Sequence, residues 1–109
     1  GRARRGGQHR PHPPHPSFQV FSKSYCPYCV KAKAALTQEL GAKAATAMAV
    51  VELDERDDGP AIQAYLGELT GGTSVPRVFV GGKFIGGGDD TVAKQRSGEL
   101  RKMLAALGL

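Results

Sequence analysis

The pattern of apolar and polar residues after position 17 predicts a small α/β domain. Residues 18–22 form a short apolar run typical of a strand, and residues 30–40 carry apolar side chains at helical spacing. We expect this helix to bury Cys29, Ala32, Leu36 and Leu40 and to end at Gly41. Residues 47–53 are apolar except for Glu52 and are followed by a charged loop. They predict a strand that is covered on both faces and runs parallel to the first.

The next segment predicts a second helix, from about residue 58 to residue 70. Asp57 or Asp58 can cap its first turn, and the Gly71-Gly72 pair stops it. We expect its buried stripe to consist of three apolar residues at helical spacing, namely Ile62, Leu66 and Leu69.

The last third of the chain predicts a hairpin followed by helices. Residues 77–80 and 83–86 flank Gly81-Gly82, which is the pattern of a β-hairpin with a glycine turn. Residues 91–107 are helical in pattern, with a break or kink at Gly98 and an inward face of Leu100, Met103, Leu104 and Leu107. The order β-α-β-α-β-β-α predicts an α/β fold, a four-stranded mixed sheet flanked by helices on both faces.

Composition and charge are uneven along the 109 residues. Residues 1–16 carry four arginines, four prolines, three histidines and no acidic residue, so they supply +4 of the formal net charge of +5. We interpret residues 1–16 as a disordered tail and residues 17–109 as one domain. The domain carries 11 basic and 10 acidic residues, so its charge gives no reason to expect a nucleic-acid partner. No apolar run approaches 18 residues, so we expect no membrane partner.

Cysteine usage bears on the compartment. Two cysteines confined to one motif fit a reducing compartment, and we expect a cytoplasmic monomer. The chloroplast stroma is the alternative, in which the Arg-rich, acid-free leader would be the remnant of a transit peptide.

The two cysteines lie in Cys26-Pro27-Tyr28-Cys29, between the first predicted strand and the first predicted helix. A Cys-x-x-Cys pair at such a junction favours thiol–disulfide exchange, because unpaired N–H groups and the positive end of the helix dipole stabilise a thiolate. Pro27 has no N–H, so Tyr28 and Cys29 are the expected donors, and Lys23 adds a positive charge nearby. Two cysteines cannot complete a tetrahedral zinc site, and no histidine lies in the predicted domain, so we expect no metal.

Three motifs at matching separations resemble the dithiol glutaredoxins of plants and algae, which have the thioredoxin fold. They are Cys26-Pro27-Tyr28-Cys29 after a strand, Val75-Pro76 before a hairpin, and Gly86-Gly87 with Asp89-Asp90 before a helix. Thioredoxin is less similar, since that family carries Trp-Cys-Gly-Pro-Cys and this chain has no tryptophan. The resemblance implies a glutathione-dependent oxidoreductase that reduces glutathione–protein mixed disulfides and protein disulfides. Cys26 would attack, and Cys29 would be the resolving thiol.

The resemblance also implies how glutathione, the co-substrate, would bind beside a glutathionylated protein. Lys23 and Gln63 would hold its glycine carboxylate, and Val75, placed by a cis Pro76, would pair with its cysteine backbone. The start of the last helical segment would receive the γ-glutamyl end. The implied glutathione contacts are Lys23, Tyr28, Gln63, Ser74, Val75, Pro76, Asp89 and Asp90.

A second function stays open at this point. Some similar proteins bind a [2Fe–2S] cluster between two chains, with one cysteine from each chain and two glutathione thiolates as ligands. In this chain Cys26 would be that cysteine. Relatives of that kind carry Cys-Gly-Phe-Ser, or Ser in place of Pro27, so Pro27 favours the oxidoreductase. Gly88 stands where many relatives have a third cysteine.

Overall fold

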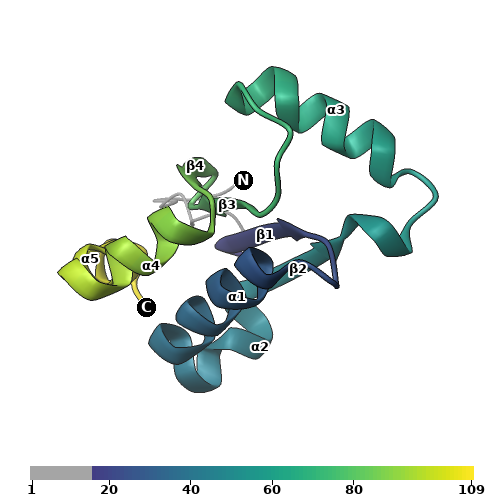
Figure 1. The fold of residues 1–109 in the computed structure, drawn as a ribbon. Helices are drawn as coiled ribbons and strands as arrows, with labels where there is room; N and C mark the ends of the chain where they lie inside the picture. The colour runs from purple at the N-terminus through teal and green to yellow at the C-terminus, as the bar shows by residue number, and fades with distance from the viewer. Residues whose placement is uncertain (1–15) are drawn as a thin grey trace, which may run out of the picture.

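The computed structural model describes residues 16–109, which form a four-stranded mixed sheet in the order β2-β1-β3-β4 (Figure 1). Strand β1 pairs in parallel with β2 and antiparallel with β3, and β3 pairs antiparallel with β4. The strands are β1 Phe18–Ser22, β2 Met48–Glu52, β3 Arg77–Val80 and β4 Lys83–Gly86. The predicted sheet is confirmed, whereas the disordered tail predicted for residues 1–16 falls almost wholly outside the described residues.

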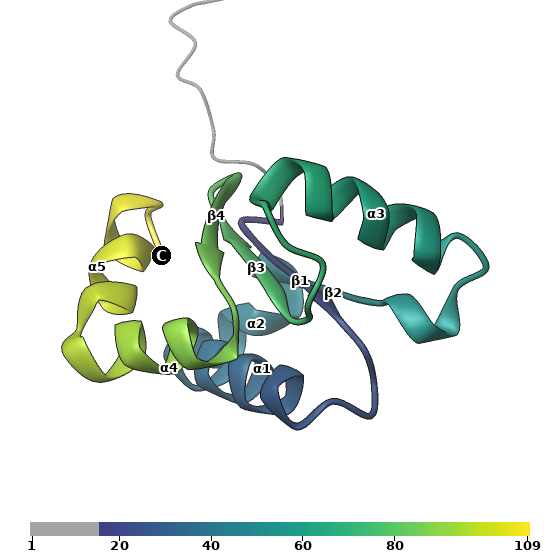
Figure 2. The ribbon, with the colours of Figure 1, turned by 45° about the horizontal axis from the view of Figure 1, so that its top comes forward.

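Helices lie on both faces of the sheet, as predicted. Figure 2 shows α3 over one face, and α1 and α4 side by side under the other. The helices are α1 Pro27–Leu40, α2 Ala44–Ala47, α3 Gly59–Thr70, α4 Gly88–Ser97 and α5 Glu99–Ala106, with short 3-10 turns η1 Gly41–Lys43 and η2 Leu53–Glu55. Gly98 separates α4 from α5 with a φ of 84°, a left-handed conformation that glycine adopts without strain.

The main apolar core lies between the sheet and α1, and α5 closes it. Phe18 of β1, Leu36 of α1 and Leu100 of α5 are completely buried. Each such side chain contributes roughly 1.5–3 kcal/mol relative to exposure. The α1 face predicted from spacing is confirmed, since Cys29, Ala32, Leu36 and Leu40 are all buried. This core fixes β1 and α1, and therefore the turn between them that carries Cys26.

Strand β2 differs from the prediction. It is parallel to β1 as expected, but it forms an edge of the sheet, and none of its residues is fully buried. The side chain of Val50 is 38% exposed. The prediction of a strand covered on both faces is therefore wrong, because an apolar run does not reveal whether a strand is central or at an edge.

The burial of apolar residues on α3 also differs in part from the prediction. Leu66 is buried as predicted, Ile62 is half-buried, and Leu69 is 58% exposed. Leu69 lines an open groove of about 350 Å³ between α3 and the sheet, so the predicted buried stripe is only partly right. Asp58 is the N-cap residue, yet its carboxylate binds the Arg56 guanidinium at 2.7 Å and makes no capping hydrogen bond.

Candidate active site

Cys26 stands at the start of α1. The helix begins at Pro27, three residues before the apolar spacing indicated, and Cys26 is its N-cap residue with extended backbone. The Cys29 N–H donates to Cys26 Sγ at 3.4 Å, so the sulfur takes the position that a capping oxygen normally occupies. Pro27 takes the first helical position, where a missing N–H removes no hydrogen bond of the helix.

This position makes Cys26 the more acidic thiol. Its partial burial opposes ionisation, but hydrogen bonds from the Cys29 side chain and N–H and from the Tyr28 N–H outweigh burial, so the Cys26 pKa is lowered. The positive charge of Lys33 adds to this effect. Tyr28 and Cys29 were the predicted donors. The basic residue that acts on the thiol is Lys33 rather than Lys23.

Cys29 is the buried and less acidic thiol of the pair. It is completely buried, and burial raises its pKa, with the neighbouring Cys26 acting in the same direction. The Lys23 N–H donates to Cys29 Sγ at 3.5 Å and only partly offsets burial. Both cysteines are free thiols in this structure, so it shows the pair in the reduced state. At neutral pH the pair therefore combines a reactive outer thiol with a protonated inner one.

Two other segments meet the Cys26-Pro27-Tyr28-Cys29 motif. The Val75-Pro76 peptide bond is cis, as predicted, and the Val75 carbonyl oxygen lies 3.9 Å from Cys26 Sγ. Helix α4 approaches α1 closely at Gly88, where an added Cβ would lie only 2.6 Å from the Tyr28 carbonyl oxygen. The Val75-Pro76 turn thus lies against Cys26, and the start of α4 lies against Tyr28 of the same motif.

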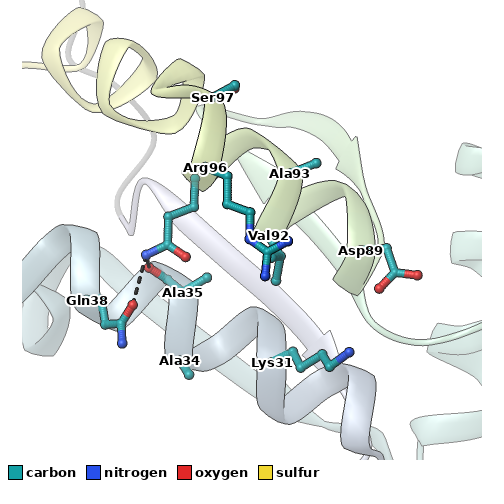
Figure 3. Close-up of a pocket in the computed structure, with 10 residues that line it drawn as sticks. Lys31, Ala34, Ala35, Gln38, Asp89, Val92, Ala93, Arg96 and Ser97 are labelled. Carbon is teal, nitrogen blue, oxygen red and sulfur yellow. Dashed lines mark hydrogen bonds between the residues drawn. The ribbon is translucent and has the colours of Figure 1, made fainter.

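The acidic pair of α4 is exposed at this meeting point. Asp90 caps the helix, because the Gly87 N–H donates to its carboxylate at 3.0 Å. The Asp89 side chain points away from α4 into solvent (Figure 3). Free N–H groups in the first turn of α4 remain available for a carboxylate.

Three of the predicted glutathione contacts interact with residues other than Cys26. Gln63 Nε2 donates to the Thr73 carbonyl at 2.7 Å, and Ser74 Oγ accepts from Arg77 at 3.2 Å. Both interactions shape the loop before Val75. Lys23 contacts Cys29 through its backbone, while its positive charge acts on Asp54.

Asp54 and Ser24 are site residues that the sequence analysis missed. Asp54 accepts hydrogen bonds from the Ser24 N–H, at 2.9 Å, and from its hydroxyl, which fixes the loop before Cys26. The hydroxyl and N–H of Ser24 lower the Asp54 pKa, and the Lys23 charge adds to this. The sequence could have indicated this pair, because Asp54 follows β2 and Ser24 follows β1. The carboxyl ends of neighbouring parallel strands meet at the same edge of a sheet.

Residues 18–85 match the family model of glutaredoxin. The chain belongs to the glutaredoxin family. It is 54% identical over 89 residues to glutaredoxin-C4 of Arabidopsis thaliana, a match that covers 82% of this chain but only 62% of that protein. The structure of oxidized glutaredoxin 2 from Chlamydomonas reinhardtii superposes with a TM-score of 0.76 at 53% identity, covering 84% of this chain and 82% of the other. A buckwheat glutaredoxin–glutathione complex gives 0.73 at 47% identity, covering 84% and 79%.

Membership confirms the predicted thioredoxin-like fold and the dithiol resemblance. Glutaredoxins are oxidoreductases that act on thiols and disulfides, and Cys26 and Cys29 are the groups able to do so here. Within residues 16–109 no cluster of three or more His, Cys, Asp or Glu is placed to hold a metal ion. In the same range, no helix is both long and apolar enough to cross a membrane.

Proposed function

We propose that this protein uses glutathione to reduce glutathione–protein mixed disulfides and protein disulfides, with Cys26 as nucleophile and Cys29 as resolving thiol. The asymmetry of the cysteine pair carries the proposal. Cys26 has a lowered pKa at the helix start, and Cys29 is buried beside it with a raised pKa. The buckwheat glutaredoxin, a relative at 47% identity, was solved with glutathione.

The first step is attack by the Cys26 thiolate on the glutathionyl sulfur of a mixed disulfide. A disulfide forms between Cys26 and glutathione, the old disulfide breaks, and the protein leaves as a thiolate that takes up a proton. A lowered pKa keeps more of Cys26 as thiolate, which is the attacking species.

Two routes then restore Cys26. A second glutathione can attack the adduct as its thiolate, which yields glutathione disulfide and the free Cys26 thiolate. Alternatively Cys29 loses its proton and attacks Cys26, which releases glutathione and leaves a Cys26–Cys29 disulfide. Two glutathione molecules later reduce that disulfide. The raised pKa of Cys29 slows the second route, because little of it is thiolate at neutral pH.

Glutathione would lie across the three segments that meet at Cys26. Val75 offers its backbone for strand-like pairing, and the first turn of α4 offers N–H groups to the γ-glutamyl carboxylate. We assign Tyr28, Ser74, Pro76, Asp89 and Asp90 to this surface, with Lys23 and Gln63 at the glycine end. Gln63 would exchange its bond to Thr73 for one to the carboxylate.

The proposed partners are glutathionylated proteins, and the proposed state is a monomer. We place the protein in the cytoplasm, with the chloroplast stroma as the alternative if the Arg-rich leader is a transit-peptide remnant.

Single cysteine variants test the mechanism. Cys26→Ser should abolish reduction of a glutathionylated substrate, because the remaining thiol is buried. Cys29→Ser should retain most of the rate, since free glutathione replaces the second sulfur. The measurement is an assay in which glutathione reductase consumes the glutathione disulfide produced. Full activity in Cys26→Ser would refute the assigned roles, and equal loss in both variants would make the dithiol route obligatory.

A further inference from the structure

A groove of about 850 Å³ runs between α1 and α4, next to the proposed active site (Figure 3). Its walls combine small apolar side chains with two basic residues and one acidic residue, Asp89. The other residues that matter here are Lys31, Ala34, Ala35, Val92, Ala93 and Arg96. We call it the α1–α4 groove. The reaction proposed above uses neither of its basic residues.

The groove leads away from Cys26. Lys31, at its near end, follows Cys26 by five residues, and Gln38, at its far end, follows by twelve. At 1.5 Å per residue the groove therefore extends from about 7.5 Å to about 18 Å along α1 from Cys26. A hydrogen bond of 2.9 Å between Gln95 Nε2 and Gln38 Oε1 bridges the two helices at the far end.

Lys31 and Arg96 give the groove a net positive charge, since Asp89 is the single acidic residue among those that line it. Neither takes part in an ion pair with another of residues 16–109, although other lysines and arginines of this domain do. The Lys31 ammonium lies 5.3 Å from the centre of the Tyr28 ring. In Figure 3 the Arg96 side chain extends along α4 over the groove near Val92, whereas Asp89 points outward at the near end.

We propose that the α1–α4 groove binds the protein part of a glutathionylated substrate and favours acidic residues near the modified cysteine. This inference rests on the proposed function. Cys26 attacks the glutathione sulfur, so the departing protein chain lies on the far side of the disulfide and leaves across the surrounding surface. An extended chain advances about 3.3–3.6 Å per residue, so acids two to five residues from the cysteine span the groove.

The expected size of the preference follows from the exposure of Lys31 and Arg96, which are both exposed. Exposed ion pairs are worth about 0.2–1 kcal/mol, which corresponds to about a 1.4- to fivefold change in kcat/KM for each pair formed. The alanine-rich walls let a peptide backbone approach closely, while Lys31 and Arg96 select its charge. The preference should decline with salt, since such charges are screened within about 10 Å at 0.1 M.

The test compares two glutathionylated peptides that differ only in charge. One carries glutamate two and four residues to each side of a single cysteine, and the other carries glutamine at those positions. Both are assayed in the glutathione reductase assay at low ionic strength, together with the mixed disulfide of glutathione and 2-mercaptoethanol. The enzymes are the parent protein, Arg96→Glu, and Lys102→Glu as a control at an exposed basic residue of α5 outside the groove.

The parent protein should favour the acidic peptide about two- to fivefold in kcat/KM. Arg96→Glu should abolish or reverse that preference, Lys102→Glu should retain it, and all three should reduce the small mixed disulfide equally. A preference that survives Arg96→Glu would overturn the inference, as would slower reduction of the small disulfide by that variant alone. Failure of the parent protein to reduce the small disulfide would instead refute the proposed function.

Discussion

At the residue scale, ionisation of Cys26 links reactivity to stability. The folded state lowers the Cys26 pKa below the unfolded value, so the thiolate stabilises the reduced protein. This contribution is fully present above the unfolded thiol pKa and disappears as the pH falls through the lowered folded pKa. Formation of a Cys26–Cys29 disulfide removes the thiolate, so the oxidised form lacks this contribution at neutral pH.

Lys33 provides a test of the charge acting on Cys26. In a Cys29→Ser background, the pH midpoint of iodoacetamide alkylation should lie below that of a free thiol, about 8.5. Lys33→Gln should raise this midpoint, because it removes a positive charge that favours the thiolate. The rise should be modest, since the Lys33 ammonium is partly exposed and also pairs with Glu52 at 2.8 Å.

Lys23→Gln is the matched control, since the Lys23 charge acts on Asp54. It should move the midpoint less than Lys33→Gln does. A parent midpoint near 8.5 would remove the electrostatic account of Cys26, and equal shifts in the two variants would remove the specific role of Lys33.

At the scale of elements, Gly59 fixes the start of α3. A Cβ added at Gly59 would lie 1.9 Å from the carbonyl oxygen of Leu53, which is backbone of η2 and cannot turn aside. Helix α3 carries Gln63 and leads into the loop before Val75, so this close approach also positions one end of the proposed glutathione site.

Gly59→Ala should therefore lower the free energy of unfolding by about 1–3 kcal/mol, although alanine is the better helix former. Urea denaturation monitored by circular dichroism measures this change. Ala61→Ser, at an exposed position in the same turn, adds one heavy atom without a clash and should stay within about 0.5 kcal/mol. A Gly59→Ala protein as stable as the parent would show that η2 and α3 can separate at no cost.

Local patterns predicted the elements and the reactive motif, but not the contacts between distant segments. Cys26 and the Gly81-Gly82 turn are each identified by their immediate neighbours in sequence, whereas the cis Pro76 was predicted from the resemblance to glutaredoxins. The pairing of Ser24 with Asp54 joins positions 30 apart and depends on β1 and β2 being adjacent. The exposure of Leu69 depends in the same way on how α3 lies over the sheet.

At the scale of the whole molecule, most of the net charge lies outside the segment that carries the proposed site. Residues 1–16 supply +4 of the net charge of +5, while every residue assigned to the proposed site lies in residues 17–109. Close to the first described residue, the Ser17 carbonyl oxygen accepts a hydrogen bond of 2.8 Å from the Gly81 N–H.

Deletion of residues 1–16 should leave kcat/KM for the small mixed disulfide and the thermal midpoint nearly unchanged, because the core and the site remain complete. The assay described above and a thermal melt measure both quantities. A fall of about 4–8 °C would correspond to about 1 kcal/mol and would show that the leader packs on the domain.

The two cysteines differ in burial, and this difference allows local opening of the domain to be measured by thiol modification. Cys29 is completely buried, whereas Cys26 is only partly covered. A folded molecule therefore presents one sulfur to any reagent in solution, and a second becomes available only when α1 lifts from the sheet. Once Cys26 has been blocked, the rate at which Cys29 is modified is governed by how often the surrounding structure opens and closes.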